Sequence, residues 1–261
     1  MIKFFRKIRY NLMEKNKTGQ YIKYAIGEIV LVVIGILIAL QINNWNEDRL
    51  TRIQIKKNLI NLSEAIKKDY NLLNQIEINN EFRYISIYQV LKWAEIPLRE
   101  LDTFNITLSS KSVWEEAIPK MFNPEFFRKT IIYIGRPRVM IVQTYAIEEL
   151  KSTGLYSQLD NQNLKNLLNE YYTGMNWFFG KDLTNNNDSS LYNYVRDKYN
   201  IRMDDLSLMN EPIELIKNDP GIIVRLRDVI SDANWRKLGA STSKMRAEEL
   251  LNELNLEIKK Y

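Results

Sequence analysis

The side chains that most often carry out catalysis are absent from this sequence. Its 261 residues include no Cys and no His, which excludes thiol nucleophiles, cysteine metal sites and the commonest general base and zinc ligand. Catalysis would have to rest on carboxylates, Lys, Tyr or a Ser–Lys pair. Adjacent carboxylates include Glu115-Glu116, Glu148-Glu149, Asp204-Asp205 and Glu248-Glu249. Because neighbours on a helix point in different directions, only the fold could bring two of these groups together.

Other motifs that might carry chemistry are incomplete. The tract 182–188 is rich in Asn and Asp, but it lacks the ligand spacing, central Gly and distal Glu of an EF-hand, so we favour a polar loop. The Gly residues are too dispersed for a phosphate-binding loop. The Ser63/Lys67 and Ser241/Lys244 spacings are expected on helix surfaces or caps. We therefore predict no catalytic, cofactor-binding or metal-binding residue, and a protein that is not an enzyme.

One carboxylate stands out because of its setting. Glu28 lies within Tyr24–Ile42, whose central part is almost entirely Ile, Val and Leu. A carboxylate inside a membrane segment is by default a functional-site hypothesis. The alternative, which we favour, is that Glu28 lies at headgroup depth and is hydrated or paired with Lys23. Small residues lie on related faces of the same segment, at Gly27, Gly35 and Ala39. The last two have the small-x-x-x-small spacing that is typical of close helix packing.

The segment Tyr24–Ile42 is long and apolar enough to cross a bilayer. Its 19 residues, at about 1.5 Å per residue, span roughly 28 Å, which is close to the hydrocarbon thickness. A cleaved signal peptide is the main alternative, because a basic stretch followed by an apolar run is its pattern. No small-x-small cleavage site follows the run, so we predict an uncleaved transmembrane helix.

Charge on the two sides of this segment predicts its orientation. The 20 residues before it carry six Lys/Arg, and the 20 after it carry four. The more basic flank is expected to stay in the cytoplasm, which places the rest of the chain in the periplasm. Trp45 suits the outer membrane–water interface, and Tyr21 and Tyr24 suit the inner one.

Residues 1–23 have a pattern of their own. Apolar residues recur at helical spacing with basic residues between them, which is typical of an amphipathic helix on an anionic leaflet; an ordinary positive flank is the alternative. The residues expected to bind the leaflet are Lys3, Phe4, Phe5, Arg6, Lys7 and Arg9. This tail holds seven Lys/Arg and one acid, whereas the remaining chain holds 30 Lys/Arg and 31 acids. Because the basic excess is confined to the tail, no nucleic-acid partner is expected.

Beyond Trp45 the pattern stays helical and predicts an all-α bundle. Apolar residues recur at three- and four-residue steps from Leu59 to Ile76, with Asp69 interrupting them, and predict a long helix that continues from the membrane span. This stripe faces either the core or a second copy of the chain, and core packing is the commoner cause. A kink is expected at Asn79-Asn80, and Pro97 is expected to end the helix.

Later helices are expected between residues that start and stop helices. The expected segments are Asn123-Pro124 to Gly135, Pro137 to Gly154, a helix capped by Asp160, Asp219-Pro220 to Gly239, and Ser241 or Thr242 to Lys260. Residues 97–111 read as a loop with an extended piece at 104–108. Tyr171-Tyr172 and Trp177–Phe179 concentrate aromatic rings on one helix, where core filling is favoured over a ligand cleft.

The N-terminal part of the sequence resembles a known family. The resemblance rests on Ile2–Arg9, Lys17–Gly19 and Tyr24–Asn46, with a weaker echo at Glu148–Gly154 and Tyr171-Tyr172. These segments are similar to an uncharacterised domain-of-unknown-function family of Bacteroidetes single-pass membrane proteins. The resemblance implies an inner-membrane anchor and a helical ectodomain, and it implies no activity. It also implies that Gly27, Glu28, Gly35, Ala39, Asn43, Asn44 and Trp45 belong to the family signature, which favours helix–helix association in the membrane.

The sequence therefore predicts three parts: a basic cytoplasmic tail at 1–23, a transmembrane helix at 24–42 and an α-helical periplasmic domain at 43–261. The favoured function is a non-enzymatic envelope protein of the bacterial inner membrane that acts as a scaffold or protein-interaction module. Its expected partners are the lipid bilayer and either another protein or a second copy, and no cofactor is expected. A ligand-sensing domain that signals through the membrane helix is the alternative, and a carboxylate-dependent hydrolase is less favoured.

Overall fold

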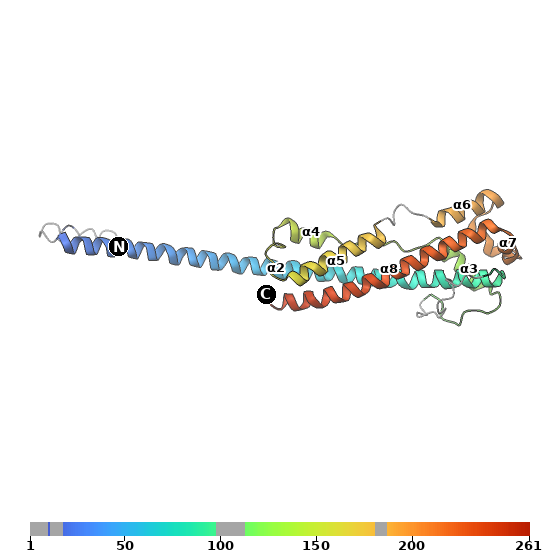
Figure 1. The fold of residues 1–261 in the computed structure, drawn as a ribbon, viewed down its shortest axis with the longest axis horizontal. Coiled ribbons are helices and arrows are strands. Elements are labelled where there is room, and N and C mark those ends of the chain that lie inside the picture. Colours follow the sequence, from blue (N-terminus) through green and yellow to red (C-terminus); the bar gives the residue numbers. More distant parts are fainter. Residues whose placement is uncertain (1–9, 11–17, 98–112, 181–186) are drawn as a thin grey trace. The chain divides into compact units, whose positions relative to one another are not determined.

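The computed structural model describes residue 10 and residues 18–97, 113–180 and 187–261. Within these residues every regular element is a helix and no strand occurs (Figure 1), which confirms the all-α prediction. The elements are α2 (Thr18–Trp93), α3 (Pro124–Ile134), α4 (Tyr145–Ser152), α5 (Gln162–Phe179), α6 (Asn187–Tyr199), the 3₁₀ helix η2 (Met203–Leu208), α7 (Pro212–Asn218) and α8 (Pro220–Ile258). The predicted tail residues Lys3 to Arg9, the extended piece at 104–108 and most of the tract 182–188 lie outside the described residues.

The chain divides into two compact units. The N-terminal unit comprises Met1–Lys57 together with Tyr261, and the C-terminal unit comprises Asn58–Lys260. Helix α2 contributes residues to both units. Its apolar stripe in the C-terminal unit, at Leu59, Leu62, Ile66, Leu73 and Ile76, is fully buried within that unit. The stripe is therefore core, and it does not present a face to a second copy.

Helix α2 runs through the position of the predicted kink at Asn79-Asn80 and continues to Trp93. Asn80 is buried, and its Nδ2 donates a hydrogen bond of 2.8 Å to the carbonyl oxygen of Ile76, one turn earlier. Its Oδ1 accepts a hydrogen bond of 2.7 Å from Arg83. The amide therefore binds within its own helix, which stays continuous past Asn80.

Within the C-terminal unit, α8 lies antiparallel to α2. Tyr70 donates a hydrogen bond to Glu248, and Lys244 pairs with Glu77. Further along α2, Lys237 pairs with Glu81, and Arg83 pairs with Asp232. The numbering on the two helices runs in opposite directions from one pair to the next. These polar pairs join α2 and α8 along their length, and the shorter helices pack against the two long ones. 

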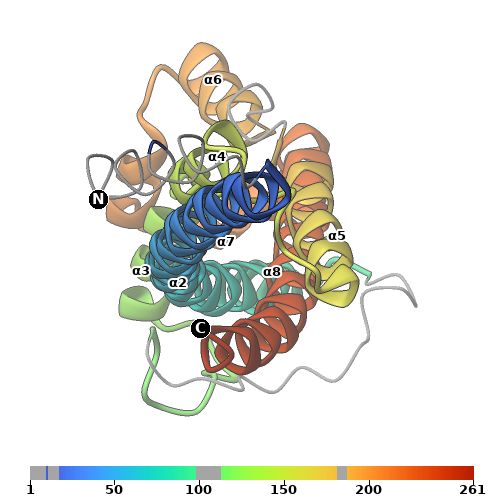
Figure 2. The same cartoon turned by 90° about the vertical axis from the view of Figure 1, so that its left-hand side faces the viewer.

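The predicted break of the last helix near Gly239 is wrong, since α8 runs unbroken from Pro220 to Ile258. Gly239 instead permits the close approach of α5, which lies beside α8 in Figures 1 and 2. A Cβ atom added at Gly239 would lie 2.8 Å from the ring of Phe178. A glycine inside a helix is therefore a packing residue here, and the sequence pattern alone does not separate this use from a helix stop.

Other predicted helix ends are partly confirmed. Asn123 caps α3 by accepting a hydrogen bond of 2.9 Å from the backbone N–H of Phe126, and Gly135 follows the helix, as predicted. Asp219 caps α8 before Pro220, also as predicted. The expected start at Pro137 is wrong, because α4 begins only at Tyr145. The cap of α5 is Asn161 and not Asp160.

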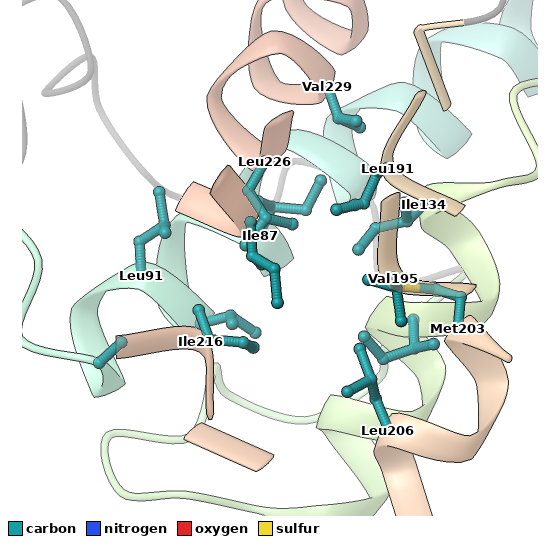
Figure 3. Close-up of a cluster of buried hydrophobic side chains, with 14 of the residues drawn as sticks. Ile87, Leu91, Ile134, Leu191, Val195, Met203, Leu206, Ile216, Leu226 and Val229 are labelled. Carbon is teal, nitrogen blue, oxygen red and sulfur yellow. The ribbon is translucent and has the colours of Figure 1, made fainter. Parts of the chain in front are cut away.

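One hydrophobic core cluster of the C-terminal unit is built from six elements. In Figure 3, Ile87 and Leu91 of α2, Ile134 of α3, Leu191 and Val195 of α6, Met203 and Leu206 of η2, Ile216 of α7, and Leu226 and Val229 of α8 gather around one centre. All of these side chains are buried. A second cluster joins Phe82 and Phe126 to Val113 and Trp114. Because α6, η2 and α7 are short, their shared burial against α2 and α8 is what holds them in place.

Candidate functional site

The N-terminal half of α2 carries the most exposed apolar surface among the described residues. Every Ile, Val and Leu side chain from Ile29 to Ile42 is 47–63 % exposed. By length and composition, α2 is the one helix in the described parts of the chain that could cross a membrane. An apolar run of this length that no other described residue buries is consistent with a membrane anchor.

Helix α2 brings three of the four predicted helix-packing residues onto one face. At about 100° per residue, Glu28, Gly35 and Ala39 fall within an arc of roughly 40°. Gly27 lies about 100° away from Glu28 and belongs to another face. Nothing lies within 4 Å of the position that a Cβ atom would take at Gly27 or Gly35. The shared face therefore combines a carboxylate with two small residues.

The predicted interface residues flank this segment. Tyr24 is 53 % exposed and Trp45 is 65 % exposed, so both rings are available to a surrounding medium. The side chain of Tyr21 lies outside the described residues. Just past the apolar run, Asn43 donates a hydrogen bond of 2.7 Å to Glu47, which marks the return of polar side chains on α2.

The C-terminal unit contains a groove that the sequence did not predict. It has a volume of about 660 Å³ and lies where α2 ends. We call it the α2/α7 groove. Its lining comes from three stretches: Lys92, Trp93 and Glu95 at the end of α2, Lys120–Phe122 before α3, and Asn210–Glu214 around the start of α7. Because these stretches are distant in sequence, no local sequence pattern predicts the groove.

Trp93 joins two of the stretches that line the α2/α7 groove, the end of α2 and Lys120–Phe122. Its indole Nε1 donates a hydrogen bond of 3.2 Å to the carbonyl oxygen of Lys120. Its ring packs edge-on against Phe122, with the ring centroids 5.5 Å apart. Beside them, Met121 is 83 % exposed. The contacts of Trp93 thus hold the stretch Lys120–Phe122 in place, and the side chain of Met121 in this stretch is exposed to solvent.

Glu95 occupies an uncommon backbone conformation at the rim of the groove. The end of α2 is closed by hydrogen bonds from Glu95 N–H to Lys92 O and from Ile96 N–H to Leu91 O. This motif puts Glu95 in the left-handed region, with φ of 57°, where Gly is the usual residue. The carboxylate contacts Lys217 of α7 at 2.6 Å. That hydrogen bond and charge lower the pKa of Glu95 and raise the pKa of Lys217.

Asp69, which interrupts the apolar stripe of α2, is a buried acceptor. Only 1 % of it is exposed. Its carboxylate accepts hydrogen bonds from the backbone N–H of Gln143 and the hydroxyl of Tyr171, each at 3.0 Å. Burial raises the pKa of Asp69 to about 6, and the two hydrogen bonds work in the opposite direction. Asp69 therefore ties α5 and the irregular segment 136–144 to α2.

Asp219 has the opposite electrostatic setting. It accepts hydrogen bonds from Tyr194, Tyr199 and Lys198, besides capping α8. Burial raises its pKa, but these donors more than offset that effect and hold the pKa at about 2. Asp219 is therefore an ionised structural hub that fixes α6 against the start of α8.

The aromatic rings of α5 divide between core and surface. Tyr171 and Phe179 are buried, as the core interpretation predicts. Trp177, in contrast, is 73 % exposed.

Among the described residues, no group of three or more acidic side chains is placed to bind a metal ion. 

Comparison with known proteins adds one match. Residues 28–113 match a family described as "Family of unknown function (DUF6090)". No curated protein and no solved structure matches the chain. The matched stretch covers about a third of the chain; it begins at Glu28, and it includes the apolar segment from there on, the rest of α2 and Glu95. The match supports an uncharacterised domain over residues 28–113.

Proposed function

We propose that this protein is a single-pass membrane protein of the bacterial inner membrane. In this proposal residues 24–42 cross the bilayer, the basic tail stays in the cytoplasm, and the C-terminal unit acts in the periplasm as a non-enzymatic interaction module. The observation that carries the proposal is the half-exposed run of Ile, Val and Leu from Ile29 to Ile42. Leaving so much apolar surface in water is unfavourable, and a bilayer removes it from water.

The proposed topology can be tested because the chain contains no Cys. Single-cysteine variants Asn16→Cys in the tail and Gln158→Cys on an exposed turn of the C-terminal unit would be treated in intact cells with a thiol reagent that cannot cross the inner membrane. We expect labelling of Gln158→Cys only. Labelling of Asn16→Cys only would reverse the orientation, and equal labelling of both in intact cells would argue against a membrane-spanning segment.

The proposed interaction role of the C-terminal unit draws on its surface. The α2/α7 groove exposes apolar side chains at Met121 and Phe122, and Leu208 nearby is 78 % exposed. Exposed apolar side chains that gather around a hollow are typical of surfaces that bind partners. Within the membrane, the face formed by Glu28, Gly35 and Ala39 is proposed as a helix-packing surface, since small residues allow close backbone approach and a carboxylate can hydrogen-bond across the contact.

A ligand-sensing module is the second candidate. The observation that favours it is that the last turn of α2 supplies Lys92 and Trp93 to the groove, while the same helix carries the apolar segment. A ligand in the groove would thus contact the helix that enters the membrane. Ligand-dependent thermal stabilisation of the full chain in detergent, across a panel of envelope metabolites, would support sensing. Stabilisation by none of them would count against it.

A further inference from the structure

A second pocket of the C-terminal unit is lined by α6 and by the start of α8, which pack against each other (Figure 1). We call it the α6/α8 pocket. Its volume of about 610 Å³ is within the range of small-molecule sites. Helix α8 contributes Arg225, from its second turn. Five residues of α6, which share one face because they recur at three- and four-residue steps, are Ser190, Asn193, Tyr194, Asp197 and Lys198.

The guanidinium group of Arg225 is held in place from two sides. Its Nη1 donates a hydrogen bond of 2.9 Å to the carbonyl oxygen of Gly221, one turn earlier. Its central carbon lies 4.0 Å from the centroid of the Tyr194 ring, in a cation–π contact. The hydroxyl of Tyr194 donates in turn to Asp219 at 2.9 Å. Gly221 leaves room for this hydroxyl, because a Cβ atom at that position would collide with it.

One edge of the Arg225 guanidinium is left without partners. Its Nε is shielded from water and has no acceptor, and its Nη2 hydrogen-bonds no described residue. The N–H groups of Nε and Nη2 point the same way, and this is an edge that can donate to both oxygens of a carboxylate at once. A shielded donor without an acceptor is unfavourable. A ligand that supplies acceptor oxygens is therefore favoured here.

The positive charge of Arg225 also has no carboxylate partner among the described residues. The other charged residues of the lining are paired, Lys198 with Asp219 at 3.1 Å and Asp197 with Arg196 at 2.9 Å. The cations that join α2 to α8 likewise have carboxylate partners. One unpaired positive charge matches a singly charged anion. The carboxylate of Asp197 in the lining disfavours an anion with two charges.

We propose that the α6/α8 pocket binds a small organic monocarboxylate. The ligand's carboxylate accepts a hydrogen bond from Nη2 of Arg225 and, after a small rotation of the guanidinium, another from Nε. The exposed side chains of Ser190 and Asn193, which hydrogen-bond no described residue, are available to polar groups on the rest of the ligand. The inference does not depend on where the chain lies relative to a membrane, so it can fail while the proposed function stands.

The first test is a titration of the detergent-solubilised full chain with sodium acetate, lactate and benzoate at constant ionic strength. Each carboxylate is compared with its uncharged amide: acetamide, lactamide or benzamide. At a concentration tenfold above its Kd, a bound carboxylate should raise the midpoint of thermal unfolding by about 3–6 °C, and the amides should not. No rise with any of the carboxylates would overturn the inference, as would an equal rise with the amides or a rise with inorganic phosphate alone.

The second test locates the binding at Arg225. Arg225→Lys keeps the positive charge but removes the planar pair of donors, so the affinity for the carboxylate should fall by roughly tenfold or more. The matched control is Arg128→Gln, which removes the charge of an exposed arginine of α3 that does not line the pocket and should leave the affinity unchanged. Equal affinities of Arg225→Lys and the wild type would overturn the inference.

Two variants at exposed positions of α6 keep the inference testable even if Arg225→Lys misfolds. Asn193→Asp adds a negative charge to the lining and should weaken binding of the carboxylate, whereas Asp197→Asn removes one and should strengthen it, each by roughly twofold to fivefold. A general loss of stability does not produce opposite shifts in affinity. Shifts in the same direction, or no shift in either variant, would mean that the carboxylate binds elsewhere and would overturn the inference.

Discussion

Replacing Asp69 with Asn is expected to change how the stability of the C-terminal unit depends on pH. Asp69 is 1 % exposed, and burial raises its pKa from 3.8 to about 6. A shift of about two pKa units corresponds to about 3 kcal/mol of unfolding free energy. Because the folded carboxyl group holds its proton more tightly than the unfolded one, its contribution to stability is fully present below about pH 4. The contribution is lost as the pH rises through about 6.

The measurement is urea unfolding of the detergent-solubilised full chain between pH 4 and pH 7.5, followed by near-ultraviolet circular dichroism. The side chain of the Asp69→Asn variant does not titrate, and the cost of its altered hydrogen bonds, about 1 kcal/mol, is the same at every pH. The informative quantity is therefore the change with pH. We expect the stability of the wild type relative to Asp69→Asn to fall by about 2.5 kcal/mol between pH 4 and pH 7.5.

The matched control is Glu64→Gln, which removes an exposed carboxylate from the same helix. It separates the effect of burial from the loss of one negative charge. A second variant, Tyr171→Phe, removes a hydrogen bond that lowers the pKa of Asp69, so in this variant the loss of stability with rising pH should extend to higher pH than in the wild type. A wild-type minus Asp69→Asn difference that stays constant with pH would refute the reasoning.

Two further predictions concern packing inside the C-terminal unit. Asp232→Ala should lower the unfolding free energy by about 3–5 kcal/mol, because it leaves Arg83, which is fully buried, and Arg236, which is 5 % exposed, without the carboxylate that both contact; a loss under about 1 kcal/mol in urea unfolding would contradict this. Gly239→Ala should lower the midpoint of thermal unfolding through a clash worth about 1–3 kcal/mol, whereas Gly35→Ala, with open space around it, should leave the midpoint unchanged. Equal effects of the two alanine substitutions would show that close α5–α8 packing is unimportant.

The parts of the fold that the sequence predicted correctly are those set by local chemistry. The buried stripe of α2 follows from helical periodicity, and the starts of α3 and α8 follow from Asn123 and Asp219, whose side chains accept backbone hydrogen bonds. The error at Gly239 has a tertiary cause. A glycine in a helix resembles a stop locally, but here it makes room for Phe178 of the neighbouring helix α5.

The two parts of the candidate site, the apolar segment and the α2/α7 groove, differ in how well the sequence predicts them. The apolar segment is contiguous, so its length and composition are enough to recognise it. The α2/α7 groove is assembled from three separate stretches, and only its exposed Met121-Phe122 pair, directly before the cap at Asn123, offered a local signal. An apolar pair before a helix cap usually packs onto the helix, so its exposure becomes evident only in the fold. Pairings such as Glu95 with Lys217 depend on tertiary structure in the same way.

The central claim is that residues 24–42 integrate into a membrane, and extraction of cell membranes with alkaline carbonate tests it most directly. The wild-type chain should stay in the membrane pellet. A variant with both Val33→Arg and Leu37→Arg should be released, since each Arg at the centre of a span raises the free energy of insertion by about 2.5–3.5 kcal/mol. The matched apolar variant, Val33→Leu with Leu37→Ile, should stay in the pellet. Release of the wild-type chain by carbonate, or retention of the double-arginine variant at the wild-type level, would contradict the account.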